Sequence, residues 1–560
     1  MKMFVVLLVA GALAAQDQPP ATNAPVLNGA VSGIVRDKNT GQPLAGYSVS
    51  TYTGAMWVGN TITMSRATKE VTSTTDDSGH YRLADLPAGA YVIAASNPSR
   101  RGGSRTVKHV ATNGHDLNGI NFDVVADGTI KGKVLDENKE PVSGVTILLA
   151  SREYFLGAAG YFPRASGRTN DRGEYSIDSV AAGEPWFLVA DVRPTQLPAH
   201  SEAPLNPKLR RRIPMRTWYP NSPSTDGAAP VILRPGEVRE GVSIEMKKSP
   251  NHCAEGTLLT ANGGPGALRF TLEALQPSSG VSESGGMFMA GANGATGADG
   301  GFRICDLYPG SYRLQAMNTG GEFQFGSALV NVADEDVRGL KIATFTTVPV
   351  AGEVVLEGPV PAVPLVPKVR VSLQPLLRTF MQGEQQASPR ADIPGPFTIA
   401  GVVPDDYMVR TFVNAPGLYV KDVLWDGISI FHQPLRLSGG MSGSGLRVVV
   451  GQDGGTLSAT VATQDGNPAP DINVVAYPAA SASEGSLAAG MVYGQTDQNG
   501  TWTSQPLAPG KYYVGAVDAG VDYHSETIAR LGRSRNRFTE VDLAPGATGQ
   551  VNLEPIARAP

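Results

Sequence analysis

The sequence predicts an all-β protein built as a tandem array of about five β sandwiches. One observation is a repeated segment, whose clearest copy is TTDDSGHYRLADLPAGAYVIAAS at residues 74–96. A second is the composition, with 66 Gly, 42 Pro and only 17% charged residues. Short alternating apolar runs separated by turn residues are typical of strands, and they leave little room for long helices. A third is the spacing of the copies, which is that of whole domains.

Each copy places an aromatic residue two positions after a Gly, and four copies place a second aromatic ten residues later. Successive first aromatics lie 94 to 127 residues apart, well above the period of about 20 to 50 residues that is typical of solenoids. We therefore expect separate domains. The second copy starts at Tyr175 and departs from the pattern at its far end. The pairs are Tyr81/Tyr91, Phe302/Tyr312, Phe397/Tyr407 and Trp502/Tyr512.

Every copy is preceded by a Gly-x-Val or Gly-x-Leu type strand and followed by a similar closing hairpin, which gives about seven strands per unit and favours a two-sheet sandwich. The turns before the first aromatic carry Asp or Asn and then Gly, residues that bond the turn backbone and adopt positive φ. The predicted domains are residues 27–125, 126–247 with an insertion at 195–229, 248–347, 348–450 and 451–556.

The first residues, MKMFVVLLVAGALAA, carry Lys2 and then an apolar run that ends in small residues. This pattern predicts a signal peptide at residues 1–15, too short to span a membrane, and hence a secreted, periplasmic or envelope protein. No later apolar stretch predicts a membrane span in the mature chain. The net charge of −5 is spread along the sequence, which argues against a nucleic-acid partner.

The two cysteines, Cys253 and Cys305, both fall in the third unit. Their strands are expected to be neighbours in a sandwich, and in an exported protein we predict a disulfide between them. The alternative is a pair of buried free thiols.

The pattern Gly-x-Val, Thr-Asp-x-x-Gly-x-Tyr-x-Leu and Leu-Pro-x-Gly-x-Tyr-x-Val resembles the carboxypeptidase regulatory-like domain. Residues 31–96 match this pattern best. The fourth predicted domain, which we call module four, departs from it most, with Asp405-Asp406 in place of the Pro-Gly step. The resemblance implies a transthyretin-like (prealbumin-like) β sandwich. SGRTNDRGEYSIDSV and RTWYPNS look like the exported multi-repeat proteins of acidobacteria. The related starch-binding-like superfamily implies carbohydrate as a candidate ligand, by analogy of fold alone.

No enzyme motif stands in a suitable context, so we predict no catalytic residue, cofactor or metal. A metallocarboxypeptidase needs His-x-x-Glu and a distant His; the chain has one such pair, His252 and Glu255, directly before a repeat strand. Calcium at the Asp-rich turns is disfavoured, because one turn offers too few oxygens.

The Pro-rich insertion at residues 195–229 is too long for a simple connection. An exposed aromatic face beside hydrogen-bond donors is what sugar binding requires, and Trp218 and Tyr219 with Arg212 and Arg216 form the best candidate patch. Other candidate platforms are Trp57, Tyr154 and Tyr161.

These observations predict a non-enzymatic, exported binding protein of the cell envelope, with a polysaccharide or an envelope protein as its partner. Two alternatives stay open. One is a spacer or scaffold without a ligand, and the other is an accessory or degenerate relative of a metallocarboxypeptidase, which would hold zinc at His252 and Glu255.

Overall fold

The computed structural model describes residues 28–556 except 52, 59–60, 67–69, 99–105, 156–157, 192–211, 275–290, 319–320, 360–364, 376–388, 414, 416, 432, 438–442 and 518–519. The predicted signal peptide at residues 1–15 and most of the first half of the predicted insertion therefore lie outside the described residues, as does the side chain of Trp57.

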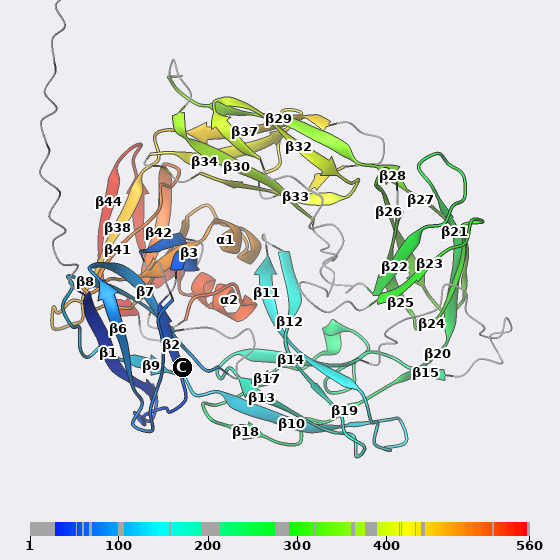
Figure 1. Cartoon of the computed structure of the whole chain (residues 1–560), viewed down its shortest axis with the longest axis horizontal. Helices are drawn as coiled ribbons and strands as arrows, with labels where there is room; N and C mark the ends of the chain where they lie inside the picture. Colours follow the sequence, from blue (N-terminus) through cyan, green and yellow to red (C-terminus); the bar gives the residue numbers. More distant parts are fainter. Residues whose placement is uncertain are drawn as a thin grey trace, which may run out of the picture.

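Within these residues the larger sheets form five pairs, which we number one to five along the chain (Figure 1). Sheet pair one joins β1 (Asn28–Asp37), β6 (His80–Pro87) and β9 (Phe122–Val124) with β2 (Ser48–Thr51), β5 (Thr72–Thr74), β7 (Gly89–Ser96) and β8 (Thr106–Thr112), beside the hairpin β3 (Thr53–Val58) and β4 (Thr61–Arg66). Sheet pair two joins β10 (Gly128–Leu135), β13 (Glu174–Val180), β18 (Val238–Arg239) and β19 (Ile244–Glu245) with β11 (Thr146–Phe155), β12 (Ala158–Arg168), β14 (Pro185–Asp191), β16 (Thr217–Trp218) and β17 (Val231–Ile232), and β15 (Arg212–Pro214) pairs with β20 (Lys248–Pro250).

Sheet pair three joins β21 (His252–Leu259), β24 (Gly301–Leu307) and β27 (Val337–Ala343) with β22 (Arg269–Ala274), β23 (Gly291–Ala295), β25 (Gly310–Met317), β26 (Gln324–Val332) and β28 (Phe345–Thr346). Sheet pair four joins β29 (Val348–Leu356), β32 (Gly395–Val402), β34 (Tyr419–Trp425), β35 (Ile428–Ser429) and β37 (Gly443–Gly451) with β30 (Leu365–Pro375), β31 (Arg390–Ile393), β33 (Asp406–Phe412) and β36 (Leu435–Arg436). Sheet pair five joins β38 (Thr456–Val461), β41 (Thr501–Thr503) and β44 (Thr548–Leu553) with β39 (Asn473–Pro478), β40 (Val492–Gln495), β42 (Gly510–Val517), β43 (Thr539–Leu543) and β45 (Pro555–Ile556).

The strand pairing repeats from one sheet pair to the next. The opening strand of each (β1, β10, β21, β29 and β38) pairs antiparallel with the first strand of the repeated hairpin and parallel with a closing strand. Apolar side chains from both sheets meet in one core per pair. The all-β sandwich prediction is confirmed. Sheet pair one has the expected seven strands, and the others add short ones. The domain limits stay a prediction.

The glycine of the opening strand is required by the closing strand. In sheet pair one, a Cβ on Gly33 would lie 2.1 Å from the carbonyl oxygen of Ile120. The same oxygen accepts a hydrogen bond of 2.6 Å from the hydroxyl of Tyr81, the first aromatic of the repeat. Only glycine allows this approach, so glycine and aromatic together position the closing strand. Sheet pair two repeats the arrangement with Gly132, Val242 and Tyr175.

The second aromatic forms a hydrogen bond with the backbone of its own hairpin. The hydroxyl of Tyr91 donates to the carbonyl of Pro87, four residues earlier, at 2.8 Å. In sheet pair two, where the sequence departs from the repeat, Nε1 of Trp186 donates to the carbonyl of Ala181 at 2.8 Å. The bond is therefore kept although the residue and the spacing change. Tyr312, Tyr407 and Tyr512 make the same bond as Tyr91 in the other sheet pairs.

The Asp or Asn of each predicted turn bonds backbone. Oδ1 of Asp76 accepts hydrogen bonds of 2.9 Å from the amides of Ser78 and His80, and the Gly that follows has positive φ. Asn170 and Asp497 make the equivalent bonds. The backbone role that the sequence predicts for these side chains is thus confirmed.

The five sheet pairs follow one another around a ring, so that sheet pair one lies beside sheet pair five (Figure 1). Two short helices, α1 (Glu484–Gly490) and α2 (Ser525–Arg533), belong to sheet pair five and lie on the inner side of the ring. The long hairpin of β11 and β12 extends from sheet pair two toward them (Figure 1). The helices pack on the face of β39 and β40 that points away from the core of their own sandwich. There they form a second apolar cluster, and Tyr154 of β11 packs against it.

Candidate functional site

The aromatic platform that the sequence predicts is not exposed. Trp218 is only 3% exposed, because β16 joins the edge of the sheet beside β14. Its ring packs against the ring of Tyr161, with centroids 5.1 Å apart, and Tyr161 in turn packs edge-on against Phe187. The exposed patch around Trp218 is therefore a wrong prediction, because the side chain is buried in a small apolar cluster with Leu148 of β11 and Val189 of β14.

The arginines of the same patch are also engaged. Arg216 is 7% exposed and forms a buried ion pair of 3.2 Å with Asp191. Arg212 is exposed and pairs with Glu137 at 3.1 Å. Tyr219 packs against the core of sheet pair two. These contacts are internal, so the four residues do not form a common binding face.

The candidate zinc ligands His252 and Glu255 lie on one strand of sheet pair three. His252 is buried in β21, whereas Glu255 forms ion pairs with Arg303 at 3.3 Å and Arg338 at 3.7 Å. Neither residue belongs to a group of three His, Cys, Asp or Glu side chains that could share a metal ion among the described residues. Cys253 and Cys305 form a disulfide, with Cα atoms 4.0 Å apart, between β21 and β24.

A site that the sequence analysis missed lies where sheet pair two meets sheet pair five. The amide of Tyr154, near the end of β11, donates to the carbonyl of Tyr523 at 2.7 Å, and the Tyr154 hydroxyl donates to Glu484 of α1 at 2.7 Å. These bonds place Glu153 opposite His524, the residue before α2.

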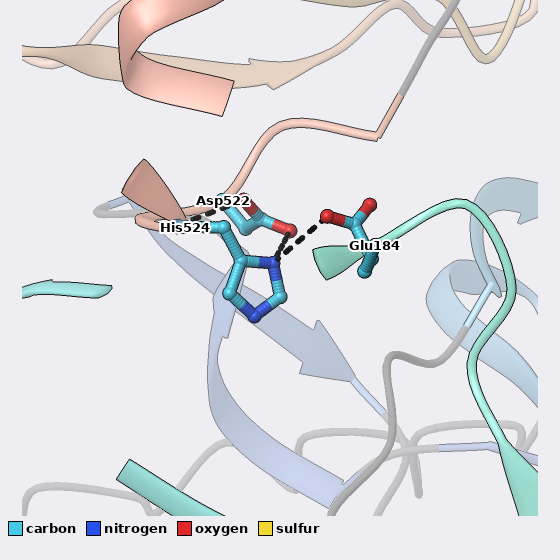
Figure 2. Close-up of side chains that lie close together, drawn as sticks. All are labelled: Glu184, Asp522 and His524. Carbon is cyan, nitrogen blue, oxygen red and sulfur yellow. Dashed lines mark hydrogen bonds and ion pairs between the residues drawn. The ribbon is translucent and has the colours of Figure 1, made fainter. Parts of the chain in front are cut away.

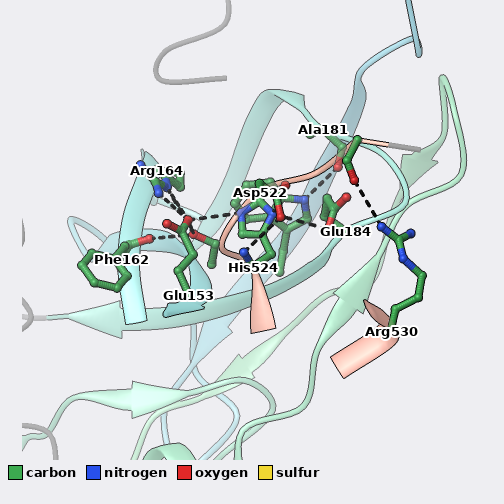
Figure 3. A network of polar contacts seen from close by, with 11 residues as sticks. Glu153, Phe162, Arg164, Ala181, Glu184, Asp522, His524 and Arg530 are labelled. Carbon is green, nitrogen blue, oxygen red and sulfur yellow. Dashed lines mark hydrogen bonds and ion pairs between the residues drawn. The ribbon is translucent and has the colours of Figure 1, made fainter. Parts of the chain in front are cut away.

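At this junction carboxylates lie near both ring nitrogens of His524, Asp522 and Glu184 near Nδ1 (Figure 2) and Glu153 near Nε2 (Figure 3). Nε2 lies 3.1 Å from Oε1 of Glu153. Nδ1 lies 2.8 Å from Oδ2 of Asp522 and 3.5 Å from Oε2 of Glu184, which stands at the turn between β13 and β14. Within the described part of the chain, this is the one place where three His, Cys, Asp or Glu side chains are close enough to share a metal ion.

Glu153 is itself held firmly (Figure 3). Arg164 donates to its carboxylate through Nε at 2.9 Å and through Nη2, and the Ser151 hydroxyl donates as well. Burial raises the pKa of Glu153, but hydrogen bonds from His524 and Arg164 outweigh it and lower the pKa to about 2. Burial likewise opposes charge on His524, yet Asp522 and Glu153 raise its pKa to about 10.

No feature of the repeat marks these residues. Glu153 lies in β11, whose pairing with β12 runs over ten register positions, more than in any counterpart pair among the described residues. Asp522 and His524 lie directly before α2, and among the described residues only sheet pair five carries α-helices. The helices α1 and α2 are also absent from the sequence-based expectation. Departure from the repeat was the available signal.

No helix among the described residues is long and apolar enough to cross a membrane.

Residues 30–124 match the family model of the carboxypeptidase regulatory-like domain. This confirms the resemblance that residues 31–96 indicated. The matched segment is sheet pair one, from its opening strand to β9. A search of curated proteins found no match to the chain.

Several solved structures match the chain at low sequence identity and low TM-score. The minor pilin of the Gram-positive pathogen Streptococcus agalactiae is 14% identical over 40% of this chain and 97% of the pilin, with a TM-score of 0.23. The major pilin subunit of Bacillus cereus is 11% identical over 76% of this chain and 98% of the pilin, with a TM-score of 0.13. The Bacillus anthracis TIE protein is 10% identical over 97% of this chain and 76% of that protein, with a TM-score of 0.15. TM-scores this low carry no argument about assembly or function.

Proposed function

We propose that the chain is an exported, non-enzymatic scaffold whose tandem β sandwiches are held as a closed ring. The observation that carries this proposal is the set of contacts between sheet pairs that are distant in sequence. Independent beads on a string would not need such contacts, because domains joined by short linkers fold without them.

The contact that closes the ring is between sheet pairs one and five. Lys108 on β8 forms an ion pair with Asp471, just before β39, and both side chains are largely shielded, at 20% and 32% exposed. Strands β4 and β40 of the same two sheet pairs also lie in contact. The ends of the array are thereby joined across more than 360 residues of chain.

Sheet pairs three and four, which are neighbours in sequence, are joined through buried groups. Arg313 of sheet pair three and Asp405 of sheet pair four form an ion pair of 2.5 Å in which the side chains are 4% and 8% exposed. Met317 and Phe325 of sheet pair three belong to the same apolar core as sheet pair four. A charge pair buried this deeply favours one relative orientation of the two sheet pairs, because a shift that parts the side chains while they stay buried leaves uncompensated charges.

Export is supported by the apolar run after Lys2 and by the disulfide, since disulfides persist in oxidising compartments. The domain limits near residues 126, 248, 348 and 451 stand within the proposal as the sequence predicts them. Carbohydrate binding is left out of it, since its candidate platform is buried. A polysaccharide or an envelope protein as the partner of the ring stays a prediction.

Carbodiimide cross-linking of the purified mature chain tests ring closure, because it joins an amine and a carboxylate only when they are in contact. We expect a linked peptide that joins Lys108 to Asp471. The exposed pair Lys511 and Glu540, 2.8 Å apart within sheet pair five, is the internal positive control. The variant Asp471→Asn removes the acceptor and should remove that one product. A Lys511–Glu540 product without a Lys108–Asp471 product in the unmodified chain would contradict the closed ring.

A further inference from the structure

The surroundings of His524 suit a bound cation as well as a proton. Nδ1 is buried and has no aligned hydrogen-bond partner, although two carboxylate oxygens lie near it. These oxygens are therefore off the axis along which the ring nitrogen directs its N–H or its lone pair. Ligands that share a metal ion have this geometry, because the ion occupies the axis and the other donors stand beside it.

The spacing of the three donors also fits. Zinc bonds of about 2.0 to 2.1 Å in a tetrahedral site place neighbouring ligand atoms about 3.3 Å apart. Oδ2 of Asp522 and Oε2 of Glu184 lie 2.8 and 3.5 Å from Nδ1 of His524. These two distances lie on either side of the ideal value. Small side-chain rotations would therefore bring all three atoms to bonding distance from one zinc ion, which leaves a fourth coordination position for water.

The far side of the imidazole is arranged as metal-bound histidines usually are. Such a histidine donates its other N–H to a carboxylate, which fixes the ring and its tautomer. Here Nε2 faces Glu153 at 3.1 Å, and Arg164 and Ser151 hold Glu153 in place. With the proton on Nε2, the lone pair of Nδ1 points toward the space beside Asp522 and Glu184 (Figure 2).

We propose that Nδ1 of His524 and the carboxylates of Asp522 and Glu184 bind one zinc ion, which joins sheet pair five to sheet pair two. The donors come from two separated parts of the chain, so binding acts as a clamp across the junction. Without the ion, the same atoms form the network of ion pairs around a protonated imidazole described above. The site is independent of ring closure at Lys108 and Asp471, and its test does not depend on that contact.

The test uses the full mature chain, freed of metal by dialysis against a chelator and titrated with Zn²⁺ by isothermal titration calorimetry. We expect one saturable site. In the double variant Glu184→Gln, Asp522→Asn, which keeps side-chain size, affinity should fall more than about 100-fold, since even an outer-shell change costs 10–100-fold. Co²⁺ as a second probe should give the visible absorption of a tetrahedral N/O site in the unmodified chain only.

The matched control is Glu526→Gln, which removes an exposed carboxylate from α2, two residues beyond His524. It should leave zinc affinity unchanged. Circular dichroism of each variant verifies that it is folded. Absence of saturable zinc binding to the unmodified chain would overturn the proposal, and so would equal affinity of the folded double variant, because the ion would then be held elsewhere.

Discussion

The repeated hairpin at residues 74–96 and the segment 520–538 of sheet pair five contribute to the molecule in opposite ways. The hairpin has counterparts along the chain, and the positions that recur in them face the core of their own sandwich or bond backbone of the same sandwich. Segment 520–538 carries α2, whereas the described residues of the first four sheet pairs contain no α-helix, and Tyr523 and His524 contact sheet pair two. The difference teaches that repeated residues build each sandwich, while residues that break the repeat join sandwiches together.

Module four shows the same rule at single-residue scale. The usual Pro-Gly step is replaced there by Asp405-Asp406. Asp405 is the residue that forms the buried ion pair with Arg313 of sheet pair three. A departure from the repeat thus marks a junction in two separate places.

The largest expected effect comes from a repeated core position. Tyr407→Ala removes a fully buried ring from sheet pair four and should cost about 3–5 kcal/mol of local unfolding free energy. Hydrogen exchange followed by mass spectrometry should show lost protection in sheet pair four, and in β25 and β26 of sheet pair three, because Met317 and Phe325 share this core. Tyr407→Phe, which loses only the bond to Val403, should cost about 1 kcal/mol. Equal effects of the two variants would contradict the core role of the ring.

Arg313→Met tests a junction residue. It leaves Asp405 buried without its partner and should cost about 3 kcal/mol. The double variant Arg313→Met, Asp405→Leu should recover most of the lost stability, because two apolar side chains can pack together without leaving a buried charge. Thermal unfolding of both variants provides the measurement. A double variant that is as unstable as the single one would show that the pair does more than join two surfaces.

A double-mutant cycle of Glu153→Gln and His524→Gln measures the junction of sheet pairs two and five. We expect a coupling free energy of about 1–3 kcal/mol, typical of contacting residues in one network. The same cycle for Glu153 and the distant Lys341 on β27 is the control and should give no coupling. If the changes in unfolding free energy caused by Glu153→Gln and His524→Gln were additive, the two side chains would not interact in solution, which would contradict the described contact.

The dependence of this coupling on pH is a smaller effect with a definite sign. The pKa of His524 is raised from 6.5 to about 10, so its contribution is complete below pH 6.5 and is lost as the pH rises toward 10. The pKa of Glu153 is lowered from 4.5 to about 2, so its contribution is present above pH 4.5 and is lost below it. The pKa shifts of His524 and Glu153 arise in part from the same ion pair, so their contributions to stability are not summed. With chelator present, destabilisation by His524→Gln should be largest near pH 5.5 and shrink by pH 10; a constant difference would contradict the charged junction.

Much of the fold could be predicted because its signals are local and repeated. Turn carboxylates, opening glycines and paired aromatics recur at fixed offsets, and each has a physical role that a single copy reveals. One repeated signal was overlooked: the Thr before each turn residue. Thr75 donates to the Leu44 carbonyl and accepts from the Tyr47 amide, and Thr169 and Thr496 make the same two bonds.

The candidate site could not be predicted in the same way. Glu153 and His524 are far apart in sequence, and their meeting depends on how whole sandwiches are placed. The prediction of an exposed patch around Trp218 was wrong for a related reason. Its aromatic and basic composition is that of a binding surface, but the same residue types also suit an added edge strand that buries Trp218 and pairs Arg216 with Asp191.

Small-angle X-ray scattering of the mature chain tests the closed ring most directly. For five domains of about 100 residues, each with a radius of gyration of about 13 Å, a closed ring has a maximum dimension of about 90 Å and a linear string about 170 Å. The account predicts a value close to that of the ring, unchanged between low and moderate salt because the junctions are largely buried. A maximum dimension close to that of the string would contradict it.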